Sequence, residues 1–151
     1  METVFIINKK YIEKDEILTK ISDIAKNINA SFFNDENDPI LTKANVDNFE
    51  QIEFGGLNKE YFKETIKNEN FIKNYGCLLT IDFSTEQNLI IIFLKAFFKE
   101  FPDMLLFSEF GEALNAPYTY SKNHLDHFSG QNGYDLISKP PKDQESKNEN
   151  F

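Results

Sequence analysis

The chain has 151 residues, the size of one domain with a single hydrophobic core. Hydrophobic residues make up 40% and charged residues 27%, which is typical of a globular protein and excludes a disordered or membrane-embedded chain. The net charge is −9, and arginine is absent. Because phosphate binding needs clustered cations, nucleic acid is not an expected direct partner, whereas a basic protein surface would be attracted.

The N-terminal third predicts a strand followed by a helix. Residues 3–7 are apolar and β-rich, and a polar Asn-Lys-Lys group closes the run. From 14 to 29, apolar residues recur every three or four positions, with acidic residues near the start where the helix dipole favours them. No basic region followed by a long apolar run opens the chain, so no signal peptide is expected and a cytoplasmic location is predicted.

The middle of the chain is less regular. Residues 34–48 are mostly polar and contain Pro39, which predicts a loop. A strand at 49–54 is expected to end at a glycine turn, and a helix is expected from 58 to about 68.

Residues 76–110 predict a strand, a helix and a strand joined by short connections. The strand at 76–83 is almost continuously apolar, as expected for a strand covered on both faces. Ser84 and Gln87 have the spacing of a helix capping box, and the following strand is expected at 104–110. This unit is long enough for a parallel βαβ crossover. The fold class predicted is α+β, a single domain with a mixed sheet packed by two or three helices.

The helix inside this unit is unusually apolar. Lysines 95 and 99 interrupt it before it reaches the roughly 20 apolar residues that a membrane span needs. At 100° per residue, Asn88 and the two lysines form one narrow polar stripe, and large apolar residues cover most of the remaining surface. The pattern favours a helix in the protein core over a partner-binding groove.

The C-terminal part predicts a short helix and a tail. The helix would begin after Thr119 or Ser121. Residues 138–151 contain two prolines, many charges and almost no apolar residues, so the domain is expected to span 1–137 and the rest to be disordered.

The residues that could support chemistry do not form a recognisable motif. Cys77 lies among apolar residues, which indicates a buried, inert thiol. Asp82 follows a buried strand, and Glu109 and Glu112 could neighbour it as paired carboxylates. His124 and His127 have helical spacing, but no third metal ligand accompanies them. We therefore expect no metal and no cofactor, and hold catalysis as the less favoured reading.

The segments "GCLLTIDFSTEQNLIIIFLKAFFKEFPDMLLFSEFG" and "YTYSKNHLDHF" resemble the small immunity proteins of bacterial polymorphic-toxin and contact-dependent-inhibition systems. The resemblance is architectural: an apolar strand, a capped helix, a second strand and an aromatic turn. It implies a stoichiometric binder that covers the active site or substrate groove of a cognate, often basic, toxin. The small size and negative charge agree with this expectation.

Exposed acids and aromatic side chains on loops are the predicted contacts with such a partner, because aromatic anchors within a charged surround are typical of interface centres. They are Asp35, Glu36, Asp38, Glu109, Glu112, Tyr118 and Tyr120. For the two tyrosines, packing against the core is an equally good expectation. The alternative function is a metal-dependent hydrolase or nucleotide-modifying enzyme that uses Asp82, His124 and His127.

Overall fold

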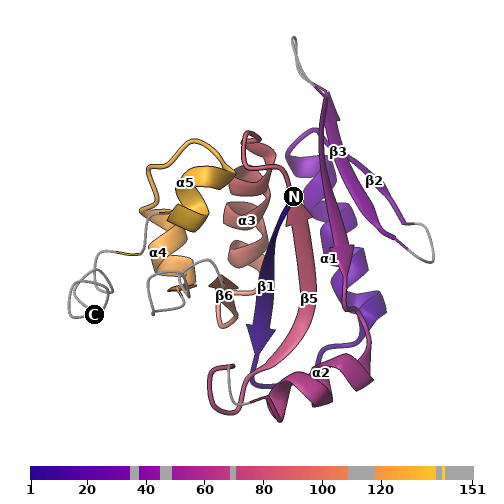
Figure 1. Cartoon of the computed structure of the whole chain (residues 1–151). Helices are drawn as coiled ribbons and strands as arrows, with labels where there is room; N and C mark the ends of the chain where they lie inside the picture. The colour runs from indigo at the N-terminus through magenta and orange to yellow at the C-terminus, as the bar shows by residue number, and fades with distance from the viewer. Residues whose placement is uncertain (35–37, 45–48, 69–70, 109–117, 139–140, 142–151) are drawn as a thin grey trace.

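The computed structural model describes residues 1–34, 38–44, 49–68, 71–108, 118–138 and 141 (Figure 1). They form a single α+β domain, as the sequence predicts. The strands are β1 (Glu2–Asn8), β2 (Ser31–Phe33), β3 (Ile40–Ala44), β4 (Phe49–Gly55), β5 (Gly76–Phe83), β6 (Leu105–Ser108) and β7 (Tyr118–Tyr120). The helices are α1 (Lys14–Asn27), α2 (Lys59–Ile66), α3 (Leu89–Glu100), α4 (Lys122–Asp126) and α5 (Gly133–Ser138).

All seven described strands join one sheet in the order β2-β3-β4-β5-β1-β6-β7, and every neighbouring pair is antiparallel. Strands β5 and β6 therefore run in the same direction, as expected for the 76–110 unit. They are not neighbours, however, because β1 lies between them and pairs with both. The predicted crossover is thus present in a split form, with the N-terminal strand at its centre. The described sheet is antiparallel throughout rather than mixed, and five described helices accompany it rather than the two or three predicted.

The larger core lies between the sheet and helices α1 and α3, which Figure 1 shows on one side of the strands. Seven residues of α3 are buried, among them Phe93, Phe97 and Phe98. Lys95, from the predicted polar stripe, donates a hydrogen bond to the carbonyl of Phe128 at 2.9 Å. The expectation that this helix is core is confirmed.

A smaller core covers part of the other sheet face. Ile7, Cys77 and Phe107 are buried there under Tyr61 of α2 and residues 71–75. An irregularity in the β1–β5 register places Cys77 opposite Ile7 and Leu79 opposite Ile6, so Leu78 is the extra residue and Cys77 and Leu79 serve different cores. Only the first half of β5 is covered on both faces, because the side chains of Thr80 and Asp82 further along are partly exposed.

The prediction of a loop over 34–48 is wrong for residues 40–44. These residues form β3, which pairs with both β2 and β4. The sequence of this segment does not alternate between apolar and polar residues. Leu41 is fully buried in the larger core, but Thr42 and Lys43 beside it are polar. Pairing with its neighbours, rather than local propensity, makes this segment a strand.

Helix α3 begins later than expected and has a different cap. The capping box predicted for Ser84 and Gln87 does not form, and the helix starts at Leu89. The carboxylate of Glu50, on β4, accepts hydrogen bonds from the backbone amides of Asn88 (3.3 Å) and Leu89 (3.1 Å). A residue 38 positions away in sequence thus satisfies the first amides of the helix.

The C-terminal elements pack beside α3. Ser121 caps α4 as one of the two expected starting points, and its hydroxyl accepts from the amide of His124. Helix α5 was not expected, and it buries Leu136 and Ile137. The predicted disordered tail, apart from Ser138 and Pro141, lies outside the described residues. No helix within the described ranges is long and apolar enough to cross a membrane.

Candidate acidic face of the sheet

Beyond the smaller core, the sheet face opposite α1 and α3 carries partly buried to exposed side chains in the part of the chain that the structure describes. Because side chains alternate along a strand, the residues between the buried positions of β1 to β5 point to this face. Phe33, Ile40, Glu53, Asp82 and Thr3 occupy one row across five strands, each directly opposite the next. We call this row, together with Gln51, the open sheet face. Its side chains range from partly buried to exposed.

Two carboxylates lie side by side at the centre of this row. Glu53 on β4 is the cross-strand partner of Asp82 on β5. Gln51 donates to Glu53 at 3.1 Å, and the hydroxyl of Thr3 donates to Asp82. Both donors are neutral, and the ion pairs found among the described residues lie elsewhere, at Lys20–Glu100 and Lys122–Asp126. The pair therefore carries two negative charges that these contacts do not neutralise.

This arrangement works against stability. Like charges directly opposite each other in an antiparallel pair destabilise a sheet, by up to about 1 kcal/mol for one pair. Each carboxylate has two oxygen atoms that can accept further hydrogen bonds beyond the one from its neutral donor. The same pair presents several oxygen acceptors to a cationic surface.

Apolar side chains continue this face beyond the carboxylates: Ile40 lies opposite Glu53, and Phe33 lies one strand further, opposite Ile40. Phe33, at the end of the row, is 58% exposed, and Phe49 at the start of β4 is 64% exposed. Large exposed aromatic rings beside charged groups are the composition of an interface centre. The row thus combines an apolar end with an acidic centre.

The predicted partner contacts are only partly placed by the structure. Asp38 is exposed and lies two residues before Ile40, near the apolar end of the row. Tyr120 is 1% exposed and donates from its hydroxyl to the carbonyl of Leu136 at 2.7 Å, so core packing, the alternative expectation, holds for this residue. Asp35, Glu36, Glu109 and Glu112 lie outside the described residues, as does the side chain of Tyr118.

The residues of the alternative enzymatic reading are not brought together by any described contact. Asp82 lies in the sheet, whereas His124 and His127 belong to α4 and its C-terminal cap. His124 accepts from the amide of Ser121 at 3.0 Å through Nδ1, and Nδ1 of His127 lies 2.9 Å from the carbonyl of Asn123. Within the described part of the chain, no three metal-ligating side chains gather.

Cys77 is fully buried in the smaller core, in agreement with the expectation of an inert thiol. Burial raises its pKa to about 12, because the thiolate would lose the solvation that water provides. Its Sγ donates to the carbonyl of Leu79 at 3.3 Å. A thiol in this state is not a nucleophile near neutral pH.

Glu53 is the residue that the sequence analysis missed. The alternation over 49–54 carried the signal, because Ile52 and Phe54 are apolar and Glu53 between them must face the other way. Its proximity to Asp82 depends on the pairing of β4 with β5, which are separated by α2 in the chain. Local sequence patterns do not contain that register.

Comparison with known proteins identifies no matching family, no matching curated sequence and no matching solved structure.

Proposed function

We propose that this protein is an inhibitory binding module of the immunity type, which neutralises a cognate bacterial toxin by covering a basic groove with its open sheet face. The observation that carries the proposal is the cross-strand pair of Glu53 and Asp82, held by neutral donors in a row of side chains that ends at the exposed ring of Phe33. Such a pair costs stability, and no described ion pair supplies its counter-charges, which a basic partner would provide.

The charge of the whole chain supports the same partner chemistry. A net charge of −9 produces an attractive field for a cationic surface and speeds association with it. Toxins that act on nucleic acids need a basic groove for phosphates. Two adjacent carboxylates on a sheet face can occupy such a groove in place of phosphate groups. The proposed partner is therefore a protein with a basic active-site or substrate groove.

A growth assay tests the function. The adjacent gene is expected to encode the end of a large secreted protein, and the C-terminal domain of that protein is expressed in a bacterial host with and without this protein. Expression of the domain alone should arrest growth, and co-expression should restore it through a complex of fixed stoichiometry that survives size-exclusion chromatography. A toxic domain that this chain neither binds nor neutralises would contradict the proposal.

The role of the open sheet face is tested by the double substitution Glu53→Gln/Asp82→Asn. It removes two charges with little change of shape, so we expect roughly tenfold slower association with the toxin domain at low salt, and a smaller difference at high salt. The matched control is Glu16→Gln/Asp103→Asn, which makes the same chemical changes in α1 and in the turn after α3. Equal rates for the two double variants would show that binding uses another surface.

A further inference from the structure

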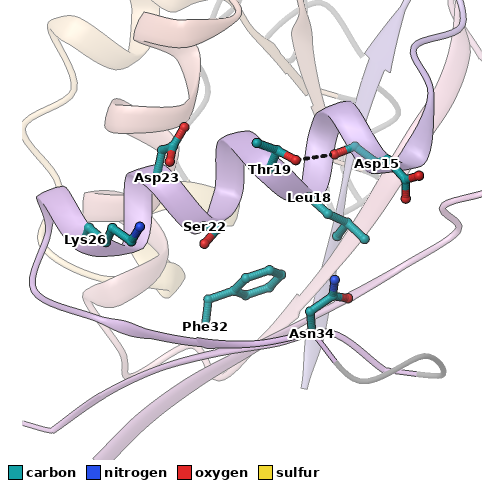
Figure 2. A pocket seen from close by; sticks show the side chains of 8 residues that line it. All are labelled: Asp15, Leu18, Thr19, Ser22, Asp23, Lys26, Phe32 and Asn34. Carbon is teal, nitrogen blue, oxygen red and sulfur yellow. Dashed lines mark hydrogen bonds between the residues drawn. The ribbon is translucent and has the colours of Figure 1, made fainter.

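A hollow of about 520 Å³ lies between α1 and strand β2 (Figure 2). Asp15, Asp23 and Lys26 line it together, so its charges are mixed and select no single class of ligand. The chemistry of the segment that joins α4 to α5 is better defined, because Asn132 stands there directly before Gly133.

Asn132 is the one asparagine of the sequence that precedes a glycine. The backbone nitrogen of a following residue can attack the side-chain carbonyl carbon of an asparagine, and glycine, which has no Cβ, hinders this attack least. A bond forms between the nitrogen of Gly133 and Cγ of Asn132, the bond from Cγ to the amide nitrogen breaks, and ammonia leaves with the proton of the attacking nitrogen. Water then opens the cyclic imide at either carbonyl, which gives aspartate or isoaspartate.

The folded chain engages both groups that this reaction needs. The amide of Gly133 donates a hydrogen bond to the carbonyl of Gln87 at 2.9 Å. The side-chain oxygen of Asn132 accepts from the amide of Asp135 at 3.0 Å and thereby caps α5. Because both hydrogen bonds must break before the nitrogen can reach Cγ, the attack requires α5 to separate from the loop between β5 and α3.

Position 133 has room only for glycine. A Cβ there would lie 2.6 Å from the ring of Phe83, which is fully buried. The amide of the next residue, Tyr134, donates to the carbonyl of Thr85 at 2.9 Å, so a second backbone bond holds α5 to the same loop. The close docking of α5 therefore depends on the residue that makes Asn132 labile.

We propose that Asn132 is a site of spontaneous deamidation gated by α5: it reacts when α5 separates from the loop, and its isoaspartate product keeps α5 apart. Aspartate, the other product, retains an oxygen for the amide of Asp135 and places a negative charge at the start of the helix, and both favour the cap. Isoaspartate instead lengthens the backbone by one carbon. It also turns the main-chain carbonyl that accepts from the amide of Leu136 at 3.3 Å into a free carboxylate.

Separation of α5 would uncover part of the larger core. Leu136 and Ile137 are buried there, and the carbonyl of Leu136 accepts from the hydroxyl of Tyr120 at 2.7 Å. The isoaspartate thus converts a reversible opening into a permanent one. The inference goes beyond the proposed function and does not depend on it, because none of these residues belongs to the open sheet face.

The rate of deamidation, measured on the full-length protein by mass spectrometry of its peptides, tests the gate. The folded chain and the chain unfolded in guanidinium chloride are kept at the same temperature and pH, and the other asparagines serve as internal references. We expect Asn132 to react at least about tenfold more slowly in the folded chain, because the reaction requires a local opening. Equal rates in the two states would overturn the proposal.

Substitution of Tyr120 tests whether α5 is the gate. Tyr120→Phe removes the hydroxyl that donates to Leu136, so deamidation of the folded chain should become about fivefold faster. The matched control is Tyr134→Phe, the same chemical change at a residue of α5 that is 58% exposed, and it should leave the rate unchanged. Equal rates for the two variants would refute a gate at α5.

Hydrogen exchange separates the two products. The aged protein is labelled intact and then digested, and the peptides that contain aspartate or isoaspartate at position 132 are resolved by chromatography. We expect the aspartate form, like an Asn132→Asp variant, to keep the protection of α5, and the isoaspartate form to exchange about tenfold faster or more. Full protection of α5 in the isoaspartate form would contradict the proposal.

Discussion

The carboxylate of Glu50 allows a direct test of how the two layers of this fold are joined. It is 7% exposed, and its two oxygens accept from the backbone amides of Asn88 and Leu89 at the start of α3. The side chain of Asn88, the N-cap residue of α3, makes no capping hydrogen bond. The substitution Glu50→Gln keeps the shape of the side chain and replaces one acceptor oxygen with a donor NH₂ group.

The expected loss follows from these contacts. A hydrogen bond to a charged group contributes about 1.5–3 kcal/mol, and a negative charge at a helix N-terminus adds about 0.3–1 kcal/mol. Removing a buried charge also recovers part of its desolvation cost. We therefore expect Glu50→Gln to lower the free energy of unfolding by about 2 kcal/mol. With a urea dependence of about 2 kcal/mol per molar, the unfolding midpoint falls by about 1 M.

Urea unfolding followed by circular dichroism measures this loss. Glu53→Gln is the matched control, since it makes the same change three residues along the same strand, on the partly exposed face. That variant should stay within about 0.5 kcal/mol of the parent or gain slightly, because it removes a like-charge pair. If the midpoints of the two variants agreed, the capping role of Glu50 would be refuted.

Two other substitutions test the cores. Phe97→Ala leaves a cavity at a fully buried site and should lower the free energy of unfolding by about 3–5 kcal/mol. The control Phe33→Ala, at an exposed site, should cost less than about 1 kcal/mol. Thermal melting measures both, and equal melting temperatures for the two variants would contradict the core assignment. The pKa of Cys77 is about 12 in the folded chain against an ordinary 9.0, so the unfolded chain loses its proton first above pH 9 and the folded chain is progressively destabilised up to pH 12. Between pH 8 and 10, the parent should therefore lose about 1.4 kcal/mol more stability than Cys77→Ala in urea unfolding, and identical losses would contradict the raised pKa.

Several elements could be predicted from the sequence because their signals are local. Strand β5 is found at the predicted residues, 76–83, since its apolar run stops sharply at Ser84. Helix α1 follows its three- and four-residue apolar spacing, and Ser121 caps α4. In each case, burial of one face and the backbone geometry of a single segment favour the same structure.

The features that escaped prediction depend on residues distant in the chain. The insertion of β1 between β5 and β6 joins residues about 80 to 100 positions apart, such as Val4 with Ile81 and Phe5 with Phe107. Strand β3 has no alternating apolar pattern, because Ile40 and Leu41 are adjacent and polar residues follow them, so it is defined by its neighbours. The cap of α3 is supplied by Glu50 from another element. The pairing register of a short strand with a polar face is only weakly specified by the sequence of that strand.

Strand β4 shows how one short segment serves both the fold and the proposed site. Glu50 and Glu53 are three residues apart, so alternation sends their side chains to opposite faces of the sheet. Toward the helices, the charge of Glu50 meets the amides of α3, and the fold itself supplies the compensation. On the open face, Glu53 meets another carboxylate, and the described contacts supply only neutral donors. A cationic partner that binds there would provide for Glu53 and Asp82 what α3 provides for Glu50, which is why the stability cost of this pair points to binding.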